Sequence, residues 1–431
     1  MNNSSHALEE TRIPIVEKVR VTNERLDADF SRIGTQIHRF PRGLRSIGGQ
    51  GDCYIVPSFV AIGPYHHGLP HLQEAEEVKY AAAHDFCTQS GHSVEEVHGK
   101  ILSIVADARR CYAADAVERF GDAEFAEMMF LDGCFLLKYM QLNQNPEEER
   151  ALLINRMVLS TGPCILRDIF LLENQLPWLV LETLTEFGNI DVFDFVSEQA
   201  TLFDVSAGDD NGLFVDETYR PQQPHILGLL RYYLIRSTRT RDMGDETTSW
   251  ALASSAIELA EMGIHLVAGN DKTGFADMSI QRRLIFGELS LTPLFLDDTN
   301  ACWLVNMAAY EACISTLYPS DGFVVSSYLS LLAMLMDKEE DVHQLRANHL
   351  LQSFFSDREM VEFFKGLARH LRLGYRYFVL LSQIHDYKRD RPIRIAIHKF
   401  LYNNFRAIVA LLSIASVLVG IFKTLMSLKQ H

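Results

Sequence analysis

The sequence lacks the short motifs by which most enzymes and nucleotide-binding proteins are identified. It contains no Gly-x-Ser-x-Gly nucleophile turn, no His-Glu-x-x-His zinc helix, no Walker-type phosphate loop and no kinase motif set. The run Gly48-Gly49-Gln50-Gly51 is rich in glycine, but it has neither the order nor the following residues of a phosphate-binding loop and is typical of a turn. These absences predict a protein that is not an enzyme and that has no cofactor.

Cysteine is scarce, and its seven positions are far apart in the chain. The number is odd, and no two cysteines have the two-residue spacing of a zinc or redox motif. We therefore expect free thiols, buried as small hydrophobic side chains in a reducing compartment. The cluster of His66, His67 and His71 suggests a metal site, but Gly68 and Pro70 keep these histidines from sharing a helix face, so we predict no metal.

Positive charge is also in short supply. The chain has 40 Lys and Arg against 56 Asp and Glu, a net charge of −16, and so lacks the positive field that nucleic-acid binding requires. The deficit is uneven, because residues 381–431 hold eight Lys and Arg against two Asp, a net charge of +6, which leaves −22 on residues 1–380. A basic collar precedes the C-terminal apolar run and suits an anionic lipid surface; it consists of Lys388, Arg389, Arg391, Arg394, Lys399 and Arg406.

Charge is absent altogether from the sixteen residues between Ala407 and Phe422. As a helix this run is roughly 24 Å long, and its extension past Lys423, whose side chain can reach the interface, gives roughly 33 Å, enough for a hydrocarbon core of roughly 30 Å. No polar face interrupts the run, so it predicts a membrane anchor, with a buried core helix as the alternative. Ser416 and Gly420 form a small-xxx-small pair that would let two anchors pack. The anchor positions are Ala407, Leu411, Ser416, Gly420, Phe422 and Lys423.

The position of the basic collar predicts how the anchor is oriented. By the positive-inside rule, the collar and the long body lie in the cytosol, and only a short tail crosses the membrane. The polar N-terminus does not have the basic region and apolar stretch of a secretory signal. We therefore predict a single-pass C-terminal anchor with a cytosolic body. An outward-facing body is the alternative, and the sequence does not identify the membrane.

The rest of the chain has the composition of a globular protein, with 48% hydrophobic and 22% charged residues. Apolar residues recur with helical spacing along most of it, so the predicted fold is mainly α, a large helical body. Residues 263–298 alternate instead, which predicts a small antiparallel β element. We expect three parts: an N-terminal helical arm (1–40), the body (41–404) and the membrane anchor (405–431).

Three segments are candidates for contacts with a partner. Residues 206–224 and 237–249 are polar, which predicts exposed loops that would subdivide the body and bind a protein partner. In the arm, apolar residues between Val16 and Ile37 follow a heptad spacing, with Asn23 at an a-type position. This spacing predicts a possible homodimer, and packing of the helix onto its own body is the alternative.

Residues 168–178 set three polar side chains inside an otherwise continuous apolar run. Glu173, Asn174 and Gln175 precede Pro177, which has no backbone donor and suits the first turn of a new helix. We expect Asn174 and Gln175 to satisfy backbone groups at a buried helix junction. The alternative is that Glu173 acts with the His66 and His67 region in an enzyme of unknown class.

Four passages follow one another along the chain: residues 41–45 with Pro57 and 61–68, residues 131–137, residues 168–177, and residues 291–293 through 297–299 to 306–311. In order and spacing they resemble the plant domain-of-unknown-function 247 family, also called uncharacterised protein family 0481. The resemblance implies a plant protein with a helical body, a C-terminal transmembrane helix and no established activity. Some grass members are linked to pollen self-incompatibility, which implies a role in recognition or signalling. Residues 403–406, Asn-Asn-Phe-Arg, depart from the Asn-Pro-Trp of many members. The signature positions, taken as structural candidates, are Gly63, Pro64, Tyr65, His66, His67, Asp132, Gly133, Glu173, Asn174, Gln175, Pro177, Asn306, Tyr310 and Glu311.

These observations together predict a membrane-anchored, non-enzymatic plant recognition or signalling protein. It would act through contacts with an unknown protein partner and with anionic membrane lipids at the basic collar, and not through nucleic acid. A membrane scaffold or adaptor that dimerises through the N-terminal helix is the alternative, and an enzyme of unknown class is a third possibility.

Overall fold

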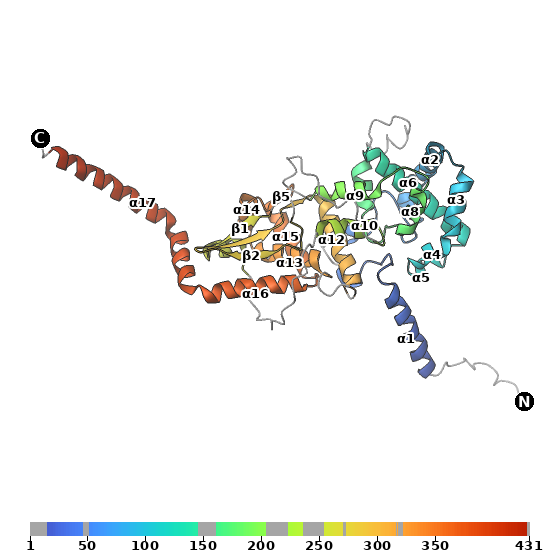
Figure 1. Cartoon of the computed structure of the whole chain (residues 1–431), viewed down its shortest axis with the longest axis horizontal. Helices are drawn as coiled ribbons and strands as arrows, with labels where there is room; N and C mark the ends of the chain where they lie inside the picture. The colour runs from blue at the N-terminus through green and yellow to red at the C-terminus, as the bar shows by residue number, and fades with distance from the viewer. Residues whose placement is uncertain are drawn as a thin grey trace, which may run out of the picture.

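Helices form most of the protein, which confirms the predicted mainly α fold (Figure 1). The computed structural model describes residues 15–45, 51–144, 161–203, 223–235, 254–269, 273–315, 317 and 322–428. In the first half of the chain the α-helices are α1 (Ile15–Arg32), α2 (Gln73–Ser90), α3 (Val94–Ser103), α4 (Val105–Arg110), α5 (Ala114–Val117), α6 (Asp122–Gln144), α8 (Trp178–Thr185) and α9 (Val192–Thr201). In the second half they are α10 (Ile226–Ile235), α11 (Ala256–Glu261), α12 (Asp298–Ile314), α13 (Val324–Leu335), α14 (Glu339–Ala347), α15 (Asp357–Ala368), α16 (Tyr375–Asp390) and α17 (Pro392–Leu428).

Two helices, α6 and α12, are buried on nearly all sides. Sixteen of the 23 residues of α6 and 13 of the 17 residues of α12 are buried, so neither helix has a polar face toward solvent. Helices α2, α3 and α8 pack around α6, and α10 and α13 pack on α12 (Figure 1). One continuous core runs from Ile37 to Tyr387 and joins the two halves of the body.

The small β element is present, and one of its pairings is parallel. Strands β2 (Ser279–Arg282) and β3 (Gly287–Leu291) form the expected antiparallel hairpin, whereas β1 (Ile264–Ala268) pairs with β3 in parallel. Alternation indicates a half-buried strand but not the direction of its neighbour, which explains the difference. A second, two-stranded parallel sheet pairs β4 (Leu294–Leu296) with β5 (Leu351–Ser353).

Apolar spacing in the sequence predicts one continuous helix over residues 95–120 and another over residues 375–404, and the structure interrupts both. The helical pattern over 95–120 is divided into α3, α4 and α5, with a break at Ile104, which adopts φ −105° and ψ 3°. The pattern over 375–404 is divided at Arg391, with φ −134° and ψ 42°, because the ring of Pro392 disfavours helical backbone in the residue before it. Helical periodicity continues across both breaks, so spacing alone did not reveal them.

The first and last helices leave the body in different directions (Figure 1). Of the heptad positions in the arm, Val19 and Asn23 are exposed, whereas Ile33 packs against the core and Ile37 lies in it. The side chains of Val16, Leu26 and Phe30 lie outside the described residues, as do nearly all of loop 206–224 and the whole of loop 237–249. Dimerisation through the arm, the partner-binding loops and the subdivision of the body therefore stay predictions.

Candidate functional site

The family-signature residues converge on a buried polar junction between α6, α12 and the segment before α8. We define the polar junction as Asp132, Asp168, Glu173, Asn174, Gln175 and Asn306, all of which are buried. Asp168 ends one helix and Pro177 caps the N-terminus of α8, so residues 169–176 turn through the core without regular structure of their own.

Side chains of the polar junction hold an irregular segment, residues 58–63, of which residues 60–63 are buried in the core. The carboxylate of Asp168 accepts hydrogen bonds from the backbone N–H groups of Ser58, Phe59 and Val60 at 2.6–3.1 Å. Burial raises the pKa of Asp168, and the three N–H donors and Arg167 oppose that rise because they favour the charged form. A buried segment outside any sheet needs such partners for its backbone groups, and this carboxylate supplies three of them.

The two amides predicted to satisfy backbone groups lie where they do so. Asn174 accepts a hydrogen bond from Ile62 N–H at 2.7 Å, and its Nδ2 donates to the carbonyls of Val60 and Asp168. Gln175 donates to the carbonyls of Ile169 and Leu171. Its Oε1 accepts from Leu227 N–H at the start of α10. These two residues therefore join the segments before α8 and α10.

Asp132 forms the third support of the same segment. It accepts from Gly63 N–H at 2.7 Å and pairs with the fully buried Lys79 at 2.7 Å, and Lys79 also reaches Glu76. The nearby carboxylates raise the pKa of Lys79 against the effect of its burial, whereas burial raises the pKa of Asp132 against the effect of Lys79. Gly63 has φ +75°, and a Cβ there would lie 2.9 Å from the Gln175 carbonyl oxygen, so only glycine fits.

Glu173 lies beside His66, as the enzyme hypothesis requires, but both side chains are buried. Glu173 is 5% exposed and accepts from Phe40 N–H at 2.8 Å and from Arg45 at 3.3 Å. Its Oε2 lies 3.6 Å from His66 Nε2, and burial, followed by the charge of Arg39, lowers the pKa of His66 to about 4. His67 lies apart, with its ring on Phe120. Burial of Glu173 as a helix-junction partner counts against a catalytic role.

The remaining N-terminal signature residues have structural contacts. Tyr65 donates its hydroxyl to the Ile37 carbonyl at 2.7 Å, and the Pro64 carbonyl accepts from Arg119. Gly133 faces Leu184, which lies where a larger side chain on α6 would have to fit. These contacts pack α6, α8 and the loop before α2 closely together.

On α12, Asn306 and Glu311 serve the same purpose. Asn306 accepts from Leu172 N–H at 2.8 Å and donates to the carbonyls of Tyr54 and Cys302. Glu311 accepts from the backbone of Val325 and Ser326 and pairs with Arg231 on α10 at 2.9 Å. Each residue therefore anchors a loop or helix start to α12.

Tyr310 packs beside a histidine that is kept neutral. Its ring lies 4.9 Å from that of His225, whose Nδ1 accepts from Gly228 N–H and caps α10. Burial lowers the pKa of His225 to about 3. The roles of His225, Lys79 and Arg231 were not predicted from the sequence, because each depends on the folded position of its partner, which for Arg231 lies 80 residues away. A basic residue inside an apolar helix, such as Arg231, was the available signal.

The described residues contain no group of three or more His, Cys, Asp or Glu side chains that could hold a metal ion. His71 Nε2 lies 3.1 Å from the Pro57 carbonyl instead of joining His66 and His67. All seven cysteines are free: Cys87, Cys134 and Cys302 are buried, as expected, whereas Cys164 is exposed, contrary to expectation. Burial raises the pKa of Cys302 to about 12, which leaves it an unreactive thiol.

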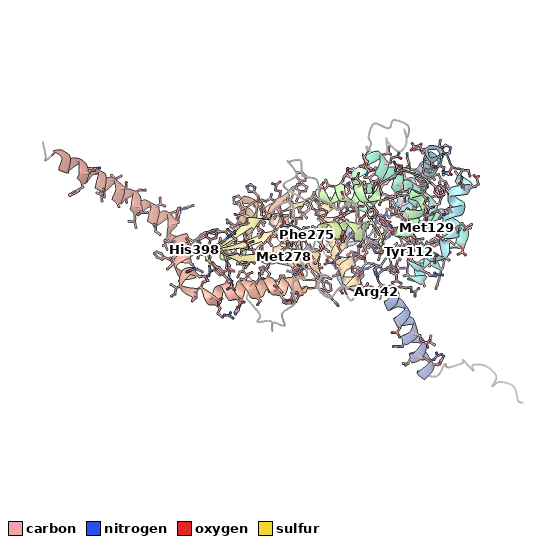
Figure 2. All side chains as sticks on the ribbon, viewed as in Figure 1. Arg42, Tyr112, Met129, Phe275, Met278 and His398 are labelled. Atoms are coloured by element: carbon pink, nitrogen blue, oxygen red, sulfur yellow. The ribbon has the colours of Figure 1, made fainter. Side chains whose placement is uncertain are left out.

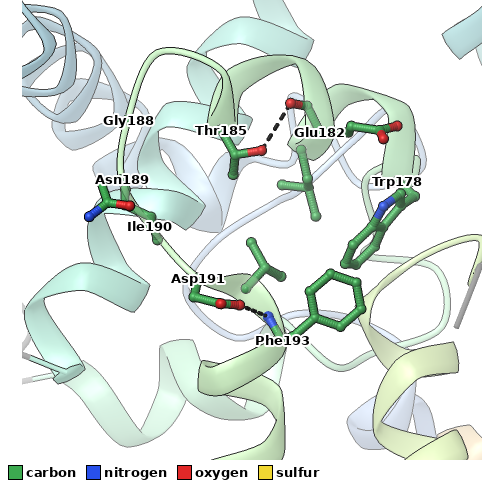
Figure 3. A pocket seen from close by; sticks show the side chains of 10 residues that line it. Trp178, Glu182, Thr185, Gly188, Asn189, Ile190, Asp191 and Phe193 are labelled. Carbon is green, nitrogen blue, oxygen red and sulfur yellow. Dashed lines mark hydrogen bonds between the residues drawn. The ribbon is translucent and has the colours of Figure 1, made fainter. Parts of the chain in front are cut away.

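A pocket of about 490 Å³ opens between α8 and α9 (Figure 3). The rings of Trp178 and Phe193 line it and meet edge to face, with centroids 5.0 Å apart. Glu182 and Asp191 supply two carboxylates, and Asp191 also caps α9 through Phe193 N–H at 2.9 Å. Aromatic faces beside carboxylates favour a cationic ligand group.

The predicted anchor lies within α17, whose residues 392–423 are long and apolar enough to cross a membrane by length and composition. Within them, the most apolar 18-residue window has a mean hydropathy of 2.3, and none of it is buried in the body. The six anchor positions, Ala407, Leu411, Ser416, Gly420, Phe422 and Lys423, are all exposed. A buried core helix, the alternative reading, does not describe this segment.

Comparison with known proteins identifies the family. The family model described as "Plant protein of unknown function", domain of unknown function 247, matches residues 37–419. UPF0481 protein At3g47200 of Arabidopsis thaliana is 26% identical over 338 residues, 73% of this chain and 68% of that protein. Putative UPF0481 protein At3g02645 of the same plant is 30% identical over 183 residues, 42% of this chain and 33% of that protein. No solved structure matches. Because the family model covers most of the sequence, the chain belongs to this plant family of unknown function.

Proposed function

We propose that this protein is a membrane-anchored, non-enzymatic recognition or signalling protein that acts through protein contacts. The observation that carries the proposal is the apolar stretch of α17, which extends from the body with no part of its most apolar window buried (Figure 1). Exposing so much apolar surface to water is unfavourable, at roughly 25 cal/mol per Å², and a bilayer removes that cost.

The polar signature residues support a role other than catalysis. Four of these residues are buried carboxylates whose oxygens accept hydrogen bonds from backbone N–H groups or pair with internal cations: Asp132, Asp168, Glu173 and Glu311. A catalytic carboxylate needs access to substrate, and these four residues are at most 5% exposed. We infer that the signature residues stabilise the fold, and that other surfaces of the body bind the partner. Such binding would serve cell recognition, for example in pollen self-incompatibility.

The pocket between α8 and α9 supports a basic protein partner. Residues 178–203, which contain the whole pocket lining, include five Asp and Glu and no Lys, Arg or His. A Lys or Arg side chain of a partner would find carboxylates at the rim and the rings of Trp178 and Phe193 inside. The membrane-facing partners would be anionic lipids at the basic collar.

Protease protection in sealed vesicles tests the topology. We expect an N-terminal tag on the full chain to be digested from the cytosolic side, because the collar favours a cytosolic body. A tag that survives protease until detergent is added would place the body on the other side of the membrane. Asn2 and Asn3, which stand in Asn-x-Ser patterns, would then be available for glycosylation.

A scaffold that dimerises through α1 is the second candidate. It is favoured by the exposed Val19 and Val21 on a helix that leaves the body (Figure 1). Size measurement of the detergent-solubilised chain, with and without residues 1–32, separates the two functions. A dimer that becomes a monomer on removal of the arm favours the scaffold, and a monomer in both forms favours the recognition module.

A further inference from the structure

The hairpin between β2 and β3 ends in two aliphatic side chains that the body does not cover. Leu284 is 87% exposed and Ile285 is 77% exposed, whereas the next residue, Phe286, packs on the ring of His265. Turns at a hairpin tip are usually polar, since they face water. An apolar tip of this kind needs a covering surface.

Arginine side chains hold this tip against the joint between α16 and α17. Arg391 donates to the Arg283 carbonyl at 2.8 Å, and Arg394 donates to the Leu284 carbonyl. Neither arginine forms an ion pair with a carboxylate in the described part of the chain. The tip is therefore fixed in place, and two positive charges stand beside it without acidic partners.

The first turns of α17 have one face on the body and an apolar face opposite. On the body side, His398 lies against Gly263 at the end of the sheet (Figure 2), and Lys399 pairs with Glu261 at 3.1 Å. At 100° per residue, Ile393, Ile397 and Phe400 lie on the opposite side of the helix, and all three are exposed. This stripe leads directly into the anchor.

The length of the candidate span places this stripe at the edge of the bilayer. The 32 residues of Pro392–Lys423 extend roughly 48 Å as a helix, against a hydrocarbon core of roughly 30 Å. If Lys423 marks the far interface, roughly twelve residues at the N-terminal end lie outside the core. Those residues carry the stripe and Arg394, and Arg391 directly precedes them, which is the composition of an interfacial helix.

We propose that the body is seated directly on the membrane surface by an interfacial patch, which consists of Leu284, Ile285, Ile393, Ile397 and Phe400. The patch enters the boundary between headgroups and acyl chains, while Arg391 and Arg394 contact the phosphates of anionic lipids. The proposal rests on the proposed anchoring by α17 and adds that the body has a fixed orientation on the bilayer.

Fluorescence quenching by brominated lipids tests this seating. The full chain carrying Leu284→Trp is reconstituted into vesicles of phosphatidylcholine and phosphatidylserine with brominated acyl chains, and the signal of the native tryptophans is subtracted. We expect strong quenching of the added tryptophan. Phe354→Trp is the matched control, since Phe354 is 83% exposed at the end of β5, away from the patch, and we expect no quenching there.

The outcomes separate seating from anchoring. If the wild-type chain does not float with the vesicles, the proposed anchoring fails. If it floats but Leu284→Trp is quenched no more than Phe354→Trp, the seating is wrong and the anchoring stands. Arg391→Gln and Arg394→Gln should each reduce the quenched population about fivefold in phosphatidylserine vesicles and have little effect in phosphatidylcholine alone. Equal effects in both lipids would overturn the phosphate contact.

Discussion

The polar junction and the C-terminal end of the protein are opposite exceptions to the usual distribution of side chains. In the junction, carboxylates and amides occupy the interior, and each has hydrogen-bond partners within the protein. In α17 and the hairpin tip, aliphatic and aromatic side chains occupy the surface and have no cover in the body. The polar groups of the junction find all these partners within the fold, whereas the apolar side chains of α17 and the hairpin tip need an environment that the body does not supply.

The polar junction therefore accounts for the stability of the fold, and the exposed apolar surface for its contacts with other molecules. Buried polar groups that are fully bonded specify a single arrangement of the core. Exposed apolar groups do not stabilise the fold and are retained for what they contact. Substitutions in the junction should therefore affect folding without affecting membrane association in the folded fraction, and substitutions in α17 should do the reverse.

The largest effect should come from charges in the middle of the anchor. Replacement of both Leu411 and Leu418 by Arg places two cations in the hydrocarbon core, at a cost of about 5 kcal/mol for the pair. We expect the variant to leave the membrane fraction in flotation assays while the thermal unfolding of the body is unchanged. Leu411→Ile with Leu418→Ile is the control and should float like the wild type. Equal flotation of both variants would contradict insertion of α17.

The next largest effect should come from Asp168. Replacement by alanine leaves the N–H groups of Ser58, Phe59 and the buried Val60 without their acceptor, and we expect a loss of about 4 kcal/mol in the free energy of unfolding. Denaturant unfolding measures it. Asp115→Ala, which breaks a surface pair with Arg39 in which the Asp115 side chain is 73% exposed, should cost less than about 1 kcal/mol. Similar losses in the two variants would show that Asp168 stabilises the protein no more than a surface ion pair does.

A smaller effect should separate two glycines with left-handed backbone. Gly63→Ala meets the Gln175 carbonyl at 2.9 Å as well as the strain of φ +75°, and we expect it to cost about 3 kcal/mol. Gly68→Ala has a similar φ of +83° but open space, so about 1 kcal/mol is expected. Thermal or denaturant unfolding gives both values. A cost at Gly68 equal to that at Gly63 would mean that the close approach in the junction contributes nothing.

The smallest effect should be a pH dependence set by His225. Its pKa is about 3 in the folded protein, so between pH 6.5 and 3 the unfolded chain binds a proton that the native state does not. Its contribution to stability is therefore lost as the pH falls, by about 2 kcal/mol at pH 5. In His225→Asn, the amide oxygen of the new side chain can still accept from Gly228 N–H. Between pH 7 and pH 5, the free energy of unfolding of this variant should fall by about 2 kcal/mol less than that of the wild type. An unchanged slope would refute the neutral, buried histidine.

Local sequence signals predicted the parts of the fold that depend on neighbouring residues. Pro177 is the N-cap residue directly before α8, the amides of Asn174 and Gln175 bond to backbone groups a few residues away, and α17 contains an uninterrupted apolar run. Each of these features is decided by the chemistry of adjacent residues. The breaks at Ile104 and Arg391 were missed because apolar spacing continues across them.

Features that depend on segments far apart in the chain could not be predicted from the local sequence. Asp168 meets Ser58 across 110 residues, and Arg231 meets Glu311 across 80, so neither partner was predictable without the fold. The parallel pairing of β1 with β3 depends on how the chain returns between them. The apolar hairpin tip was missed because Leu284 and Ile285 resemble ordinary strand residues; the arginines before them were the only local signal.

The most direct test of the account is alkaline carbonate extraction, followed by flotation, of the full chain in microsomes. If α17 is inserted in the bilayer as proposed, the chain stays in the membrane fraction and floats with it. A chain ending at Arg406 should be released into the soluble fraction under the same conditions. Release of the full chain by carbonate, to the same extent as the shortened one, would contradict the claim that a membrane covers α17.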